Sequence, residues 1–188
     1  MKTTKRFENA VSRLYEAFHA GTLESQSCRA CAVGNIVGTQ QWISGVDFDN
    51  PTEDGFYARG LITIQSGLSH AYKAFSKSGY SVEELSEVEY IFMREHDASG
   101  ITMSFDDTLY DIEKYGYWVA NGVDFESEDE VRQYFREVQF KSLCKVVEYL
   151  SELDGIENPM DYSKLFETEN CGESVCKAKY QLEEVFND

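Results

Sequence analysis

Residues 127–155, which read SEDEVRQYFREVQFKSLCKVVEYLSELDG, decide the fold. Apolar residues recur every three or four positions in this stretch, which is the spacing of one helix face. The opening Ser127-Glu-Asp-Glu130 is a capping box, in which each of the two side chains accepts a hydrogen bond from the other residue's backbone amide. Asp154-Gly155 supplies a stop signal at the other end. The stretch therefore predicts one long helix from about residue 128 to residue 153.

Shorter helices are predicted outward from this stretch on the same grounds. Apolar residues at helical spacing mark each of them, and glycine follows two of them, at Gly21 and Gly79. Ser27 is expected to cap one helix, while Ser81 and Glu84 form a second capping box. The expected helices cover residues 4–20, 28–38, 61–75 and 82–96.

Residues 97–126 follow a different pattern. Ile101, Met103 and Phe105 alternate with polar residues, and Asn121-Gly122 is a favoured two-residue turn between two short apolar runs. A small β-hairpin is therefore expected near residues 101–125. The fold class predicted for the chain is mainly α: a compact helical domain of about five helices with this hairpin. No linker or repeat divides the sequence, so residues 1–188 are expected to form a single helical domain.

Negative charge is the strongest signal in the composition. The chain has 34 Asp and Glu against 17 Lys and Arg, a formal net charge of −17. Direct binding to nucleic acid is disfavoured, because phosphate contacts need a concentrated set of Lys and Arg side chains. Residues 1–8 lack the apolar run of a secretory signal, and no run approaches 18 apolar residues. We therefore expect a cytoplasmic protein without a membrane partner.

Many of the acidic residues gather in clusters along the chain. Such clusters commonly serve solubility and place favourable charge at helix N-termini. A more specific interpretation is that rows of carboxylates imitate the phosphates of a nucleic acid and occupy a basic groove on another protein, where complementary potential speeds the encounter. The candidate binding residues are Glu83, Glu84, Glu87, Asp106, Asp107, Asp111, Asp124, Glu126, Glu128, Asp129 and Glu130.

The local motif that could carry cysteine chemistry is Cys28-Arg-Ala-Cys31. At positions i and i+3 of a helix the two sulfurs share a face, and a helix N-terminus favours the thiolate form. A zinc site needs four ligands, so Cys144 and His19 are candidates for completing a zinc or iron site; redox exchange by the pair is the other chemical use. The opposing interpretation is that Cys28 and Cys31 are small apolar residues packed in the core.

Several segments resemble a family of small uncharacterised bacterial proteins. The most specific is Cys28-Arg-Ala-Cys-Ala-Val-Gly-Asn-Ile36, and a second is Met160-Asp-Tyr-Ser-Lys-Leu-Phe166. Members often carry the name of one component of the sodium-translocating NADH:quinone reductase, which implies a flavin domain and a plant-type iron–sulfur ferredoxin domain. The chain departs from both, because plant-type ferredoxin spacing needs a cysteine before the Cys-x2-Cys pair and none precedes Cys28, and because 188 residues leave no room for a flavin module. The name is therefore not transferred as a function.

These observations favour a non-enzymatic binding or regulatory protein that docks its acidic surface onto a basic protein partner. One form of this hypothesis is an inhibitor of a nucleic-acid-handling complex, as an anti-defence protein would be. The alternative is a metal-binding or redox protein built on Cys28 and Cys31. An enzyme is the least favoured class, because the sequence contains no phosphate-cradling loop, dinucleotide fingerprint or hydrolase nucleophile motif.

Overall fold

The structure, a computed structural model, describes residues 3–25, 30–37 and 78–156. These residues form five helices and one two-stranded antiparallel sheet, so the predicted mainly α fold with a small hairpin is confirmed. None of the described helices is both long enough and apolar enough to span a membrane. In chain order the elements are α1 (Lys5–His19), α2 (Ala32–Val37), α5 (Val82–Ala98), α6 (Phe105–Tyr115), β1 (Trp118–Ala120), β2 (Val123–Phe125) and α7 (Glu128–Leu153).

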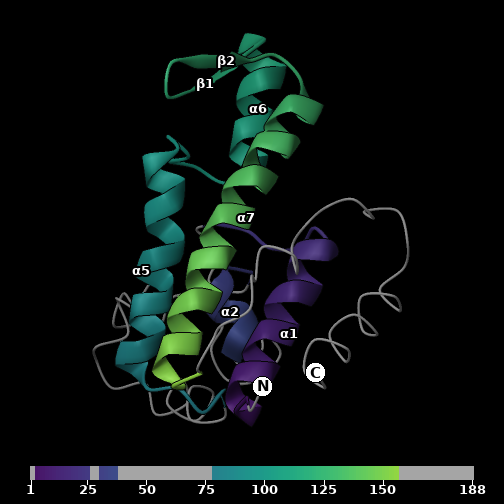
Figure 1. Ribbon diagram of the computed structural model, residues 1–188. Coiled ribbons are helices and arrows are strands. Elements are labelled where there is room, and N and C mark those ends of the chain that lie inside the picture. The colour runs from purple at the N-terminus through teal and green to yellow at the C-terminus, as the bar shows by residue number, and fades with distance from the viewer. Residues whose placement is uncertain (1–2, 26–29, 38–77, 157–188) are drawn as a thin grey trace, which may run out of the picture.

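Helix α7 is the central element, and it contacts α1, α5 and α6. It lies antiparallel to α5, and the two helices form the long axis of the molecule (Figure 1). The predicted capping box is present, since the Ser127 hydroxyl accepts from the Glu130 amide and the Glu130 carboxylate accepts from the Ser127 amide at 3.1 Å. Asp154 is the C-cap, and Gly155 follows with a φ of +62°. The long predicted helix is therefore confirmed at both ends.

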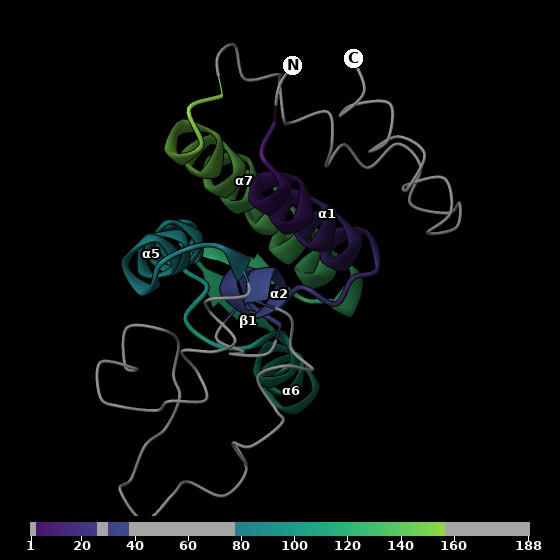
Figure 2. The same ribbon diagram turned by 90° about the horizontal axis from the view of Figure 1, so that it is seen from below.

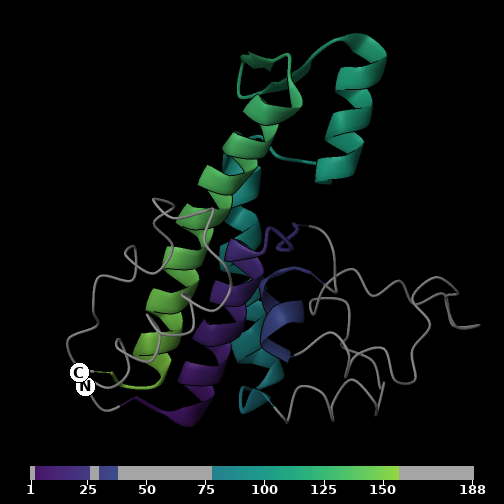
Figure 3. The ribbon, with the colours of Figure 1, turned by 90° about the vertical axis from the view of Figure 1, so that its right-hand side faces the viewer.

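The buried apolar residues form two separate cores. The larger one, which we call the proximal core, joins α1, α2, α5 and the second half of α7, and α2 lies between α1 and α5 within it (Figure 2). The smaller distal core joins α6, the hairpin and the first half of α7, which project together beyond the proximal bundle (Figure 3). The distal core consists of Ile101, Trp118, Ala120, Phe125, Val131, Phe135 and Val138.

The hairpin forms where Asn121-Gly122 predicted it. Both turn residues have positive φ, +50° and +78°, which is what a turn of this type requires. The Asn121 side-chain amide also donates to the Ala98 carbonyl at 2.9 Å, and this bond fixes the turn against the end of α5. The alternating residues from Ile101 to Phe105 do not form a strand, however. Ser104 instead caps α6, because its hydroxyl accepts from the Asp107 amide at 3.1 Å.

Helix α2 begins later than the sequence pattern suggested. The expected start was Cys28, but Ala30 and Cys31 lie in a turn and the helix begins at Ala32. The Cys31 sulfur accepts from the Gly34 amide at 3.4 Å, so the cysteine side chain takes the capping role expected of Ser27. Cys28, the expected helix over residues 61–75 and the last 32 residues lie outside the described part of the chain.

Candidate functional site

Eight of the eleven candidate acidic residues lie in one region, which we call the distal lobe (residues 101–138). This lobe contains α6, the hairpin and the first turns of α7 (Figure 1). It carries ten acidic and three basic side chains, a formal net charge of −7. Asp106 and Asp107 lie in the first turn of α6, while Glu128, Asp129 and Glu130 lie in the first turn of α7. Helix N-termini stabilise such carboxylates through the positive end of the helix dipole.

Some of these carboxylates already have structural roles. Glu130 caps α7, and hydrogen bonds from the Glu126 amide and the Ser127 side chain lower the pKa of its carboxyl group. Glu128 pairs with Arg132, one turn further along the helix. The Asp107 carboxylate accepts from the Ser104 hydroxyl at 2.7 Å. These three carboxylates are therefore engaged with neighbouring groups of the lobe itself.

Four other candidate carboxylates of the lobe are exposed and form no ion pair with any residue of the described ranges. Their charge therefore faces the solvent. Asp124 and Glu126 lie on or next to β2, on the outer face of the hairpin, since β1 and β2 pair Val119 with Asp124 in register. The four residues are Asp106, Asp124, Glu126 and Asp129.

Large exposed apolar and aromatic side chains accompany this charge. Of the six found among the described residues, five belong to the distal lobe and the sixth, Tyr90, lies on α5. Three tyrosines of the lobe, Tyr110, Tyr115 and Tyr117, are 53–58% exposed, although tyrosine normally buries much of its ring. We call these three tyrosines the tyrosine patch; the other two exposed residues of the lobe, Val119 and Val123, lie on opposite faces of the hairpin. Sequence analysis gave no role to these residues, because an exposed tyrosine and a core tyrosine look alike in a sequence.

Lys114 shows how the rings of the patch interact with a cation. Its ammonium group lies 4.9 Å from the centre of the Tyr115 ring and 5.3 Å from that of Tyr110. Contacts with the side chains of Tyr115 and Tyr110 raise the pKa of Lys114. Both distances fall within the range of cation–π attraction. The surface of α6 therefore combines carboxylates with aromatic faces that accept a positive group.

The remaining candidate residues, Glu83, Glu84 and Glu87, lie elsewhere. They occupy the first turns of α5, at the opposite end of the α5–α7 pair from the hairpin (Figure 1). Glu84 closes the Ser81 capping box and lies 3.5 Å from the Arg6 guanidinium. Hydrogen bonds with its own backbone and with Ser81 lower the pKa of Glu83. The structure thus separates the candidate residues into a distal group of eight and a proximal group of three.

The candidate metal ligands that are described do not converge. Cys31 is buried in the proximal core at the start of α2, and Cys144 packs against the same core from α7. The His19 ring stacks on Tyr15, with centroids 4.2 Å apart. Within residues 3–25, 30–37 and 78–156, no three His, Cys, Asp or Glu side chains are placed to hold a metal ion. Cys28, the first cysteine of the motif, lies outside these ranges.

Comparisons with known proteins give no match to a family model, to a curated protein or to a solved structure.

Proposed function

We propose that the chain is a non-enzymatic binding or regulatory protein that docks its distal lobe onto a basic surface of another protein. The observation that carries the proposal is the coincidence, on one lobe, of unpaired outward carboxylates with the tyrosine patch. Solubility alone requires only dispersed charge, whereas exposed tyrosines are costly to leave in water and are typical of protein interfaces. The lobe therefore has a feature that a purely solubilising surface does not need.

The two components have different roles in docking. The charge of −7 on the lobe steers a basic partner toward it and raises the association rate, an effect that salt weakens. The tyrosine rings then supply buried contact area and cation–π contacts to Lys or Arg side chains of the partner. Lys114 already makes such contacts with Tyr110 and Tyr115 inside the lobe.

A nucleic-acid-handling protein is the narrower form of the proposed partner. Grooves that bind phosphates are concentrated basic surfaces with aromatic or arginine side chains, and they complement a lobe of this composition. Binding there would exclude the nucleic acid, so the chain would act as an inhibitor. The test is competition: the protein should displace labelled duplex DNA from a purified basic DNA-binding protein, and it should do so less effectively as salt is raised.

Docking itself can be tested with a labelled oligo-arginine peptide as the basic probe. In fluorescence anisotropy, replacing three exposed distal carboxylates (Asp124→Asn, Glu126→Gln and Asp129→Asn together) should weaken binding about tenfold. The matched control replaces three exposed proximal carboxylates (Glu87→Gln, Glu148→Gln and Glu152→Gln together), which changes the net charge equally. The control should bind nearly as the original protein does. Equal weakening in both variants would show that only total charge matters, and the docking surface would be rejected.

The contribution of the exposed tyrosines to binding can be tested with two matched tyrosine variants. Tyr117→Ala should weaken binding of the peptide several-fold without changing its salt dependence, because the substitution removes contact area and no charge. Tyr90→Ala removes an equally exposed tyrosine outside the lobe, and we expect it to have no effect. Identical affinities for the two variants would remove the tyrosine patch from the proposal.

A further inference from the structure

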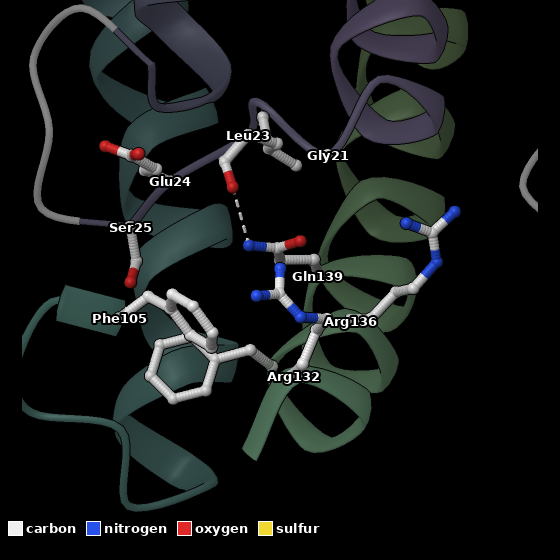
Figure 4. A pocket seen from close by; sticks show the side chains of 9 residues that line it. Gly21, Leu23, Glu24, Ser25, Phe105, Arg132, Arg136 and Gln139 are labelled. Carbon is white, nitrogen blue, oxygen red and sulfur yellow. Dashed lines mark hydrogen bonds between the residues drawn. The ribbon is translucent and has the colours of Figure 1, made fainter. Parts of the chain in front are cut away.

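A pocket of about 140 Å³ lies where the proximal bundle meets the distal lobe. Its walls come from the segment that follows α1, from the first residue of α6 and from one side of α7 (Figure 4). These parts are far apart in the sequence, so no motif predicts the pocket. Unlike the acidic surface of the lobe, its polar groups are mainly hydrogen-bond donors. The donors considered below belong to Ser25, Arg132 and Gln139, and the apolar wall consists of Phe105 and Phe135.

Ser25 is the first indication that the pocket receives a ligand. The residue is 3% exposed, and its hydroxyl has no hydrogen-bond partner among the described residues. A buried hydroxyl without a partner is unfavourable, and most such groups in proteins are satisfied. Ser25 lines the pocket, with its hydroxyl toward Phe105 (Figure 4). A ligand oxygen held there would accept the missing hydrogen bond.

Arg132 supplies positive charge to the same space. Arg132 lines the pocket with a side chain that is 60% exposed, so its guanidinium lies at the rim, whereas that of Arg136 points away (Figure 4). Arg136 lies over the Phe18 ring at 4.5 Å and donates to the Phe18 carbonyl at 3.4 Å, so it belongs to the contact with α1. Arg132 lies 5.0 Å from the Phe105 ring centre. That stacking holds its planar group at the edge of the pocket, where a carboxylate can bind it with two parallel hydrogen bonds.

Gln139 and the two phenylalanines complete the binding environment. The Gln139 amide donates to the Leu23 carbonyl at 2.7 Å, which fixes its orientation. Its second amide hydrogen has no acceptor among the described residues. The rings of Phe105 and Phe135 meet edge to face, with centroids 5.4 Å apart, and form an apolar wall. The pocket therefore offers donors on one side and aromatic surface on the other. This combination suits an anionic group attached to a small apolar skeleton.

Glu24 limits the charge of the ligand. Its carboxylate is exposed and also lines the pocket, but it points away from Arg132 (Figure 4). Glu128 pairs with Arg132 as well, so part of the positive charge is already neutralised. At the same position these two carboxylates repel a dianion about twice as strongly as they repel a monoanion. The electrostatics thus favour a single negative charge.

We propose that this pocket binds a small organic monocarboxylate, with its carboxylate on Arg132, Gln139 and Ser25 and its apolar part against Phe105 and Phe135. The site is separate from the docking surface, since none of the four unpaired carboxylates and none of the exposed tyrosines of the lobe lines the pocket. A ligand seated there contacts α6, α7 and the segment after α1 together. Binding would therefore stabilise the junction between the two cores.

The test is an NMR titration of the full chain with benzoate, acetate and inorganic phosphate as separate probes. Benzoate should shift the amide signals of Ser25 and the Gln139 side chain saturably, with a Kd of about 1 mM, and acetate should bind more weakly because it lacks the aromatic part. Arg132→Gln should weaken benzoate binding at least about tenfold, and Ser25→Ala about threefold. The control, Arg94→Gln, removes the same charge from an exposed position on α5 and should leave binding unchanged.

Three results would overturn the assignment. These are the lack of any saturable shift with benzoate, equal affinity in Arg132→Gln and Arg94→Gln, and phosphate binding as tightly as benzoate at the same amides. If Arg132→Gln lowers the melting temperature, Arg132→Lys provides the second variant. It keeps the charge but loses the two parallel hydrogen bonds, so it should still weaken binding of benzoate.

Discussion

Asp154 connects three helices through a single carboxylate. Its side chain is fully buried, and it accepts from two nitrogens of Arg6, at 2.6 and 2.8 Å, and from the hydroxyl of Thr4. Arg6 also donates to the Gly79 carbonyl at 2.8 Å and lies over the Tyr80 ring. The start of α1, the start of α5 and the end of α7 are therefore joined at one point. A buried charge is tolerated only while such partners are present.

Arg6→Met should consequently destabilise the protein by about 3 kcal/mol, because it leaves the Asp154 carboxylate buried without its cation. The free energy of unfolding, measured by urea denaturation, checks this value. Adding Asp154→Asn to the same variant should recover part of the loss, since the uncompensated charge is then removed. If the double variant is no more stable than Arg6→Met, the loss is not due to the buried charge.

His96 is a buried histidine that should make the stability of the protein depend on pH. It is fully buried on α5, its Nδ1 lies 2.9 Å from the Phe92 carbonyl, and its Nε2 has no partner among the described residues. Burial lowers the pKa of His96 below the ordinary value of 6.5. The His96 ring therefore binds a proton less readily in the folded protein than in the unfolded chain. The free energy of unfolding should be insensitive to this group above about pH 6.5 and should fall as the pH drops below it.

Urea denaturation at about pH 7.5, 6.5 and 5.5 measures this dependence. In His96→Gln the fall between pH 6.5 and 5.5 should largely disappear, while the variant is less stable overall because a buried ring is lost. The control, His19→Gln, alters a less buried histidine on α1. In this variant the free energy of unfolding should still fall between pH 6.5 and 5.5 as it does in the original protein. A slope that survives in His96→Gln would assign the pH dependence to other groups.

Among the elements, the two glycines that flank α6, Gly100 before it and Gly116 after it, contribute to stability in different ways. Gly116, the C-cap of α6, has a φ of +84°, and a Cβ there would meet no atom within 4 Å. Gly100 has a φ of +74°, and its Cβ would lie 2.9 Å from the backbone nitrogen of Asn121. The first position demands only the left-handed conformation. The second also brings the end of α5 against the hairpin turn.

Gly116→Ala should therefore cost about 1 kcal/mol, from backbone strain alone. Gly100→Ala should cost about 2 to 3 kcal/mol, because the Cβ also pushes against the turn. Chemical denaturation of the two variants gives the comparison. Equal losses would mean that the close approach between Gly100 and Asn121 does not contribute to stability.

The helices that sequence reasoning found were those with complete local signals. The capping boxes at Ser81 and Ser127 predicted the starts of α5 and α7 to the residue. Helix α6 was not predicted, because the alternation from Ile101 to Phe105 resembles a strand and hides the Ser104 cap. The alternation is explained by packing instead: Ile101 is buried in the distal core, and the Phe105 ring packs edge to face against Phe135 of α7. A local pattern cannot show such a long-range contact.

At the scale of the whole molecule, the candidate site was only partly predictable. The acidic clusters were visible in the sequence, but their grouping was not, because the antiparallel arrangement of α5 and α7 puts Glu83 and Glu87 at the far end from Asp124 (Figure 1). The pocket was invisible for the same reason, since Ser25 and Arg132 meet only through the tertiary fold. Charge and exposed aromatic residues combine into a surface only once the helices are in place.

The two cores differ in size, and this difference predicts unequal stability. Among the described residues the proximal core contains 22 buried residues and the distal core seven. Local opening follows the amount of buried apolar surface, so the smaller unit opens at a lower free energy. In hydrogen exchange, amides of α6 and the hairpin should exchange faster than those of α1 and the second half of α7. Uniform protection throughout would show that the molecule opens only as one unit.

The late position of α7 in the chain also bears on synthesis. Helices α1, α5 and α6 all contact α7, yet they leave the ribosome before it does. Until α7 emerges, α5 lacks the element with which it makes its most extensive contact among the described residues. A nascent chain in this condition is prone to aggregation. Ribosomes stalled before residue 128 should therefore carry chains that bind holdase chaperones, and those stalled well beyond residue 156 should not.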